Sequence, residues 1–174
     1  MAKDYFPLRK GLKLDYRHKF GTAKPGKMRF EVISADEQPG STSATCVRIF
    51  DGKPSPEYVM LKDEKKGWLS SSNWGKEFPL PPVVGKEWQR SPDLFRVEAL
   101  DEEIETPAGK FTDCLKVVRL AAGGDAGTEE RYYAEDVGLV YAFSNDESDP
   151  YELALTEGPI RIVGVPKTKP SKKS

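Results

Sequence analysis

The sequence has little of the material that most metal sites and enzyme active sites require. Its 174 residues include two cysteines and one histidine, too few for the Cys and His sets that usually bind zinc. It contains no G-x-S-x-G, P-loop or G-x-G-x-x-G motif, the common signatures of nucleophile and nucleotide sites. We therefore expect a protein that is not an enzyme and that holds no metal or cofactor.

Long apolar runs and an excess of one charge are also missing. No stretch approaches the ~18 apolar residues of a membrane span, and 27 Lys and Arg balance 28 Asp and Glu. We expect no membrane span and no nucleic-acid partner. The charge is uneven, however, with a net +7 over residues 1–30 and −12 over residues 91–157. These charges cancel if the first strands pair with the last, as closure of a sheet favours; otherwise they form a dipole suited to a charged partner.

Alternation of apolar and polar side chains is the dominant pattern of the chain. Over residues 12–20 one parity holds Leu12, Leu14, Tyr16, His18 and Phe20, a period of two that is typical of a half-buried strand. No window keeps helical spacing for three turns. Similar short segments recur at intervals of about 8 to 12 residues. We predict an all-β fold, a curved antiparallel meander of about ten strands that forms a half-open barrel.

Glycine, proline and parity changes predict where the strands end or bend. Hairpin turns are expected at residues 21–26, 106–109, 121–127 and 145–150. Residues 78–85 hold three prolines and are predicted to form a crossing loop. The apolar parity changes after residue 99, which predicts a β-bulge near residues 100–102. We expect one domain over residues 1–165 and a disordered, lysine-rich tail over residues 166–174.

The few potentially reactive side chains have structural interpretations. Cys46 and Cys114 are either two buried thiols or one disulfide between strands, which an oxidising compartment would permit. A dyad of Cys114 and His18 is conceivable, but Cys114 opens a predicted strand, whereas nucleophiles normally sit on exposed turns. The carboxylates at 129–130 lie beside a predicted turn, so we expect them to be solvated.

Four segments in order resemble a known family: YFPLRKG at 5–11, VGKEW at 84–88, TPAGKF at 106–111 running on to Cys114, and YYAEDVGLV at 132–140. They are similar to a bacterial domain-of-unknown-function family related to the lipoprotein-localisation-factor superfold. The resemblance covers residues 5–156 and implies a curved sheet half-closed around an apolar hollow. Members of the family usually carry an export leader. The chain as written starts without one, so we expect a cytoplasmic protein, or an envelope protein if a leader has been removed.

Two functions fit this fold. The first is binding of a small apolar or amphiphilic ligand on the concave face, for which the candidate residues are Tyr16, His18, Phe20, Phe30, Trp68 and Trp88. The alternative is a structural or protein-interaction domain of a larger assembly, marked by an exposed apolar patch or an unpaired strand edge. The oligomeric state stays open. A cavity of at least ~300 Å³, open between the sheet and the proline segment, would favour ligand binding.

Overall fold

The computed structural model describes residues 2–120 and 128–159, which contain thirteen β-strands. In chain order these are β1 (Lys13–Phe20), β2 (Gly26–Gln38), β3 (Ser41–Phe50), β4 (Lys53–Pro54), β5 (Tyr58–Asp63), β6 (Trp68–Ser71), β7 (Gly75–Pro79), β8 (Glu87–Arg90), β9 (Asp93–Thr106), β10 (Gly109–Leu120), β11 (Glu129–Ala134), β12 (Gly138–Ser144) and β13 (Tyr151–Glu157). The described residues form no helix, and hence none that could cross a membrane. The all-β prediction is confirmed.

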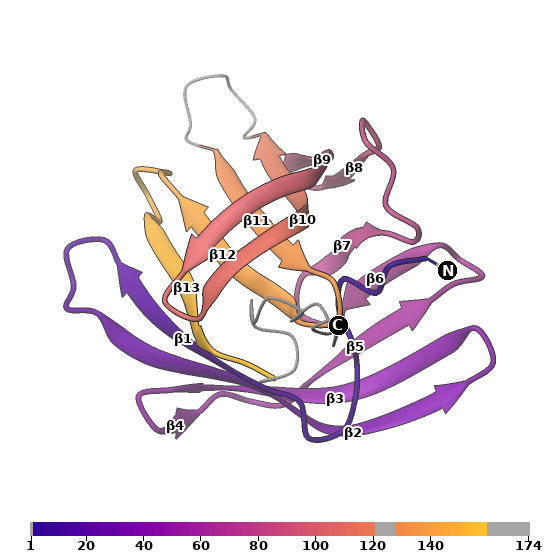
Figure 1. The fold of residues 1–174 in the computed structure, drawn as a ribbon, viewed down its shortest axis with the longest axis horizontal. Helices are drawn as coiled ribbons and strands as arrows, with labels where there is room; N and C mark the ends of the chain where they lie inside the picture. Colours follow the sequence, from indigo (N-terminus) through magenta and orange to yellow (C-terminus); the bar gives the residue numbers. More distant parts are fainter. Residues whose placement is uncertain (1, 121–127, 160–174) are drawn as a thin grey trace, which may run out of the picture.

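A single antiparallel sheet accounts for the architecture. The strand order is β7-β6-β5-β3-β2-β1-β13-β12-β11-β10-β9-β8, and β4 pairs with β3. The sheet curls until it nearly closes into a barrel, and within the described residues a seam without backbone pairing remains between its edge strands β7 and β8 (Figure 1). The predicted half-open barrel is confirmed. It has more strands than predicted because short strands such as β4 and β7 form where the sequence predicted none.

The first and last strands pair with each other. β1 lies antiparallel to β13, and Nη2 of Arg17 on β1 is 4.0 Å from Oε1 of Glu152 on β13. The basic start of the chain and its acidic later part therefore meet on neighbouring strands, where opposite charges offset each other. The sequence prediction that favoured this pairing is confirmed.

The long β9–β10 hairpin contains the predicted bulge. Cys114 lies opposite Glu102 and Lys116 opposite Ala99, so β9 has one residue more than β10 over this stretch. The extra residue reverses which side chains face inward, and this explains the change of parity in the sequence. The hairpin turn follows Thr106 as predicted, because the ladder closes on a pair of Thr106 and Gly109.

Other predicted segments fit less closely or lie outside the described residues. Phe78 and Pro79 belong to β7, so the crossing loop begins after them and is shorter than predicted. The hairpin turn at 145–150 lies between strands as predicted, and the one predicted at 21–26 spans residues 21–25, because Gly26 already begins β2. The loop at 121–127, the apolar piece at 160–165 and the tail at 166–174 fall outside the described residues.

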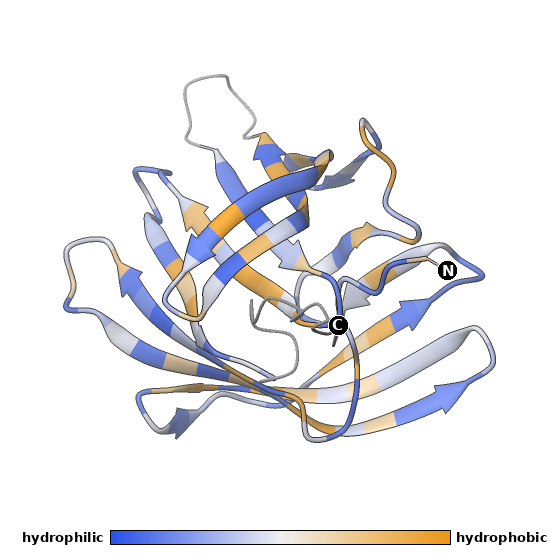
Figure 2. Ribbon diagram, viewed as in Figure 1, coloured by the Kyte–Doolittle hydropathy of each residue, from blue (hydrophilic) through white to orange (hydrophobic). Residues whose placement is uncertain are grey.

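The interior is formed by the inward-facing parity of the strands and by the chain before β1. Along the strands of Figure 2, hydrophobic and hydrophilic residues alternate, and on β1 the buried residues are Leu14, Tyr16 and His18. The N-terminal segment adds Phe6, whose ring centroid lies 5.5 Å from that of Phe30 on β2 and 6.1 Å from that of Tyr133 on β11. Phe6 thus connects two strands that are not neighbours in the sheet.

Both cysteines are free thiols in this interior. Cys46 on β3 and Cys114 on β10 are fully buried and unbonded. The interpretation as two small buried residues is confirmed, and the disulfide alternative is wrong. Burial raises the pKa of Cys46 to about 12 and that of Cys114 to about 11, the latter also because of the nearby Asp113 and Glu102. Neither thiol is activated as a nucleophile would be.

Candidate functional site: a cavity with an apolar and a charged wall

A cavity of about 590 Å³ lies within the curved sheet. We call one side the apolar wall, which comes mainly from β1, β2, β3, β5 and β13: Tyr16, Met28, Phe30, Phe50, Met60 and Leu153. We call the other side the charged wall, which comes from β7 to β11: Glu77, Arg90, Asp93, Arg119, Glu129 and Arg131. The charged wall spans the seam, because β7 and β8 are the two edges of the sheet.

The cavity reaches solvent at a rim of exposed side chains. Phe20 at the end of β1 is 43% exposed and Trp74, between β6 and β7, is 37% exposed. Ser91 and Asp149, from the β8–β9 and β12–β13 connections, are exposed lining residues of the same cavity. The proline-rich residues 80–85 do not line it. A second cavity of about 320 Å³ lies between the start of that segment, β5 and the N-terminal residues 2–4, so a cavity of the size and place named in the sequence analysis exists in addition to the main one.

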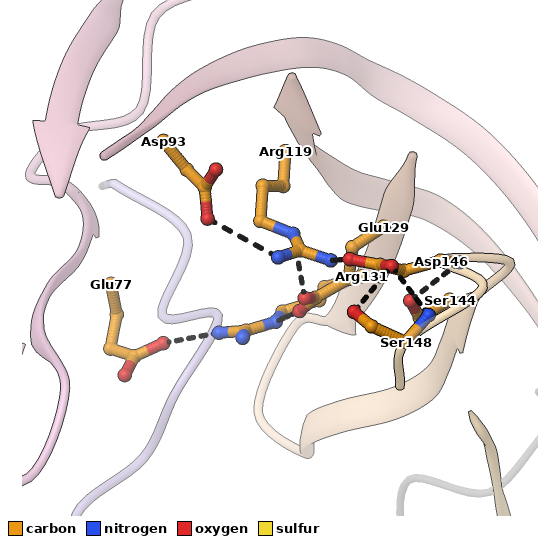
Figure 3. A network of polar contacts seen from close by, with 8 residues as sticks. All are labelled: Glu77, Asp93, Arg119, Glu129, Arg131, Ser144, Asp146 and Ser148. Atoms are coloured by element: carbon orange, nitrogen blue, oxygen red, sulfur yellow. Dashed lines mark hydrogen bonds and ion pairs between the residues drawn. The ribbon is translucent and has the colours of Figure 1, made fainter. Parts of the chain in front are cut away.

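The charged wall is organised around two arginines (Figure 3). Arg131 on β11 donates from Nη1 to Oε2 of Glu77 on β7 over 2.9 Å, and from Nε to Glu129. Nε of Arg119 on β10 lies 3.3 Å from Oε2 of Glu129, an ion-pair contact that does not have hydrogen-bond geometry. Glu129 thus connects the two guanidinium groups, and Glu77 ties β11 to the far side of the seam.

Two aspartates complete this network. Arg119 donates from Nη1 to Oδ2 of Asp93 over 3.2 Å and from Nη2 to Oδ2 of Asp146 over 3.3 Å. The other oxygen of Asp146 accepts hydrogen bonds from the backbone N–H and the hydroxyl of Ser148, at 2.9 and 2.7 Å. Those hydrogen bonds lower the pKa of Asp146, so the group remains a carboxylate at neutral pH.

Burial and ion pairing oppose each other at Glu129. Its side chain is only 8% exposed, and burial alone would raise its pKa. The charge of Arg131, hydrogen bonding with Tyr151 and the charge of Arg119 together more than offset that effect, and the pKa of Glu129 lies below its ordinary value. Burial likewise disfavours the charge of Arg131, but Glu129 and Glu77 hold its pKa well above the ordinary value. Glu129 and Arg131 therefore both keep their charges at neutral pH.

Strand periodicity places these charges inside the barrel. Glu129, Arg131 and Tyr133 are every second residue of β11, and all three line the cavity. The ladder sets Arg119 directly opposite Glu129. The expectation that the carboxylate at 129 is solvated is wrong, since Glu129 is buried. The sequence contained one hint, which was the charged residues 129–131 at the start of a strand-like segment. Alternation alone does not determine which of these charged side chains face the interior.

The structure brings three of the six predicted ligand residues to the cavity. Tyr16, Phe20 and Phe30 line it, and the Tyr16 hydroxyl donates to the backbone oxygen of Leu139 over 2.6 Å, which fixes that ring in the wall.

The other three predicted residues are not among those that line the cavity. Trp68 and Trp88 pack on each other edge to face, with ring centroids 5.7 Å apart. His18 packs against Phe20 and Phe50, and its Nε2 lies 3.7 Å from Oδ2 of Asp51.

The cavity is also lined by Arg48, a cation that the sequence analysis did not single out. The guanidinium carbon of Arg48, on β3, lies 3.9 Å from the centre of the Trp74 ring and 5.8 Å from that of Tyr58. Such stacking stabilises a guanidinium group by cation–π attraction. Arg48 forms no ion pair with the described residues. Within these residues its charge is therefore stabilised by aromatic rings and not by a carboxylate.

Comparison with known proteins identifies the fold and no family. No family model matches the chain, and no curated protein matches it. Two solved structures are similar to it over 90% of its length and 99% of theirs. One is a Bacteroides fragilis protein that is inferred to be exported and has a YmcC-like fold, with 17% identity and a TM-score of 0.63. The other is a protein from Parabacteroides distasonis that is inferred to be a lipoprotein, with 15% identity and a TM-score of 0.55.

These similarities support the part of the predicted resemblance that concerns a bacterial, barrel-like β fold. They do not support the more specific relation to the lipoprotein-localisation-factor superfold. At this level of identity the likeness concerns the fold alone.

Proposed function

We propose that this domain is a non-enzymatic carrier or receptor for a small ligand with an apolar body, which it binds in the cavity. The observation that supports this most directly is the cavity itself. Its volume of about 590 Å³ falls within the ~300–1,000 Å³ of typical ligand sites. In a small barrel whose interior served only stability, side chains would be expected to fill this space.

The lining also suits a ligand with an apolar body. The apolar wall offers aromatic and methionine side chains, and methionine adapts readily to ligands of different shape. Tyr16, Met28 and Phe30 are each at most 5% exposed, so a ligand in contact with them would be removed from water. Burial of apolar ligand surface would then supply the main driving force for binding.

The non-enzymatic part of the proposal rests on the reactive groups. The thiols of Cys46 and Cys114 have raised pKa values and do not line the cavity. His18 is likewise not among the lining residues. The charged groups that do line it are largely engaged with one another, which suits a structural or orienting role better than proton transfer.

A second candidate, a protein-interaction domain, rests on a different observation. Val83 and Val84 are adjacent and 58% and 56% exposed, on the loop that follows β7. Exposed apolar side chains of this kind can form part of a docking surface. We favour the first candidate because the cavity has the volume of a ligand site, aromatic side chains in its lining and an open rim.

Titration with the uncharged fluorescent probe N-phenyl-1-naphthylamine tests the proposal. Ala142 lines the cavity and is 2% exposed, so Ala142→Phe places a ring in the space that the ligand would take. We expect the native chain to bind the probe and this variant to bind it at least about tenfold more weakly. Val59→Phe, at a position 41% exposed on β5, adds the same ring volume outside the cavity and should bind like the native chain. Probe binding that is absent from the native chain, or equal in both variants, contradicts the proposal.

A further inference from the structure

The three arginines of the charged wall differ in their partners. Arg119 and Arg131 each contact at least two carboxylates. Arg90, the last residue of β8, forms no ion pair within residues 2–120 and 128–159. Its Nη1 is buried and has no hydrogen-bond partner there. A guanidinium N–H that is shielded from bulk water and lacks an acceptor is costly, so the site is incomplete without one.

Packing holds the Arg90 guanidinium against the cavity. Its central carbon lies 4.7 Å from the centre of the Phe95 ring, and both residues line the cavity. The guanidinium group therefore packs over an aromatic ring at the cavity surface, and its unpartnered Nη1 remains available to an acceptor. An acceptor that arrives in the cavity can therefore meet a donor that is already positioned.

The carboxylates of the network do not neutralise Arg90. Burial lowers the pKa of Arg90 despite the opposing influence of Glu77 and Glu129. At Arg119 and Arg131 the neighbouring carboxylates outweigh the effect of burial, and both pKa values are raised. The ion pairs agree with this balance, because Glu77 contacts Arg131, Glu129 contacts Arg131 and Arg119, and neither forms an ion pair with Arg90.

We propose that the ligand is an amphiphile with an oxyanion headgroup, a carboxylate or a phosphate ester, and that Arg90 binds this headgroup while the alkyl body lies along the apolar wall. This rests on the proposed function, because it names the chemistry of the ligand in the same cavity. A guanidinium edge pairs with either oxyanion through two parallel hydrogen bonds. Arg48, which also lines the cavity, adds a second cation without a carboxylate partner in the described residues.

The charge of the network sets the expected salt dependence. Glu77, Asp93, Glu129 and Asp146 face two paired arginines, so the charged wall has no excess of positive charge to attract anions from a distance. Selectivity should come from short hydrogen bonds to Arg90. Buried contacts of this kind are screened much less by salt than surface charges are, so the preference for an anion should persist at raised ionic strength.

Competition against the neutral probe, with ligands that differ only in the headgroup, tests the inference on the full-length chain. The set is dodecanoate, dodecyl phosphate, dodecanol and dodecyltrimethylammonium, each below its micellar concentration. We expect at least one of the two anions to bind on the order of tenfold or more tightly than dodecanol, and the cation to bind most weakly. The tighter anion identifies the headgroup as carboxylate or phosphate.

Variants then assign the preference to Arg90. Arg90→Met should reduce the affinity for the anion to that for dodecanol, and Arg90→Lys should restore part of the preference. Arg96→Met is the matched control, because Arg96 pairs with Glu98 and Glu87 and does not line the cavity. Equal binding of dodecanol and both anions by the native chain overturns the inference and leaves the proposed function standing. An anion preference that survives in a folded Arg90→Met variant also overturns it, and failure of the whole series to bind contradicts both.

Discussion

Trp88 on β8 donates its indole N–H to the backbone oxygen of Lys76 on β7 over 3.1 Å. These strands are the two ends of the sheet, and no backbone ladder pairs them in the described residues. The Trp88 ring also stacks on Phe95, with centroids 5.9 Å apart and planes at 21°. A side chain thus bridges the seam where the barrel lacks main-chain hydrogen bonds.

Replacing this bridge should loosen the seam. Trp88→Phe keeps an aromatic ring and removes the donor, so we expect a loss of about 1 kcal/mol in the free energy of unfolding. Amide hydrogen exchange should accelerate mainly in β7 and β8, because edges without a partner open locally. Trp74→Phe, at the exposed rim, serves as the control and should leave exchange in both strands unchanged. Uniform acceleration over the whole sheet would show that Trp88 supports the core and does not specifically hold the seam.

The two thiols should be inert in the folded protein. At pH 8 a thiol-specific reagent should modify neither Cys46 nor Cys114 until denaturant unfolds the chain, since both are buried and protonated. Modification should follow the unfolding transition measured by tryptophan fluorescence. Rapid labelling without denaturant would contradict the buried positions of both residues.

The raised pKa values of the thiols also predict the alkaline stability. Both thiols ionise near 9.0 when unfolded, and near 12 and 11 in the fold. The unfolded chain therefore releases protons first as the pH rises, and stability falls with increasing pH above about 9. Cys46→Val, which keeps an apolar side chain of similar size, should reduce this slope in urea unfolding measured from pH 8 to pH 11. An unchanged slope would assign the alkaline loss to other groups.

Much of the architecture could be predicted because strands leave a local signal. Leu14, Tyr16 and His18 of β1 alternate with exposed or half-buried residues, and the structure buries these three on one face. The end of β1 departs from the pattern, since Phe20 is 43% exposed at the cavity rim. The bulge after Ala99 could also be predicted, since an inserted residue must reverse the parity.

The charged wall could not be predicted, because its partners meet only through the sheet. Glu77 and Arg131 are 54 positions apart in the sequence. They meet because the sheet curls, which brings its edge strand β7 close to β11 near the opposite edge. Local patterns assign charged residues to the solvent face. The sequence also could not show which aromatic residues line the cavity. Trp68 and Trp88 were predicted to do so, but they pack on each other, and alternation does not distinguish such packing from the lining of a cavity.

Glu129 should be the most sensitive position of the charged network. Glu129→Gln removes the carboxylate shared by Arg119 and Arg131 at a buried site, and we expect a loss of about 3 kcal/mol in the free energy of unfolding. Because the folded pKa lies below the ordinary 4.5, the native carboxylate contributes fully above that pH and progressively less as the pH falls below it. The difference between native and variant chains should therefore shrink in acid.

A surface carboxylate provides the comparison. Glu103 pairs with Lys110 at 2.6 Å, but the two side chains are 56% and 59% exposed. Glu103→Gln should change the stability by less than about 1 kcal/mol. Urea unfolding of the three chains from pH 3 to pH 7 measures both effects. If the two variants lose equal stability at pH 7, the buried network contributes no more than a surface pair.

Gly138 meets two separate constraints at the start of β12. Its φ is +113°, and a Cβ atom there would lie 3.3 Å from Cδ1 of Leu14, a fully buried residue of β1. Gly138→Ala should therefore cost about 1–3 kcal/mol from backbone strain, and more if Leu14 cannot shift in a closely packed interior. Gly11→Ala separates the two contributions, because Gly11 has φ +84° and open space around the added Cβ. Chemical denaturation should show a larger loss for Gly138→Ala than for Gly11→Ala, and the additional Leu14→Val substitution should recover part of the difference. Equal losses in the two single variants would mean that backbone strain alone requires glycine at 138.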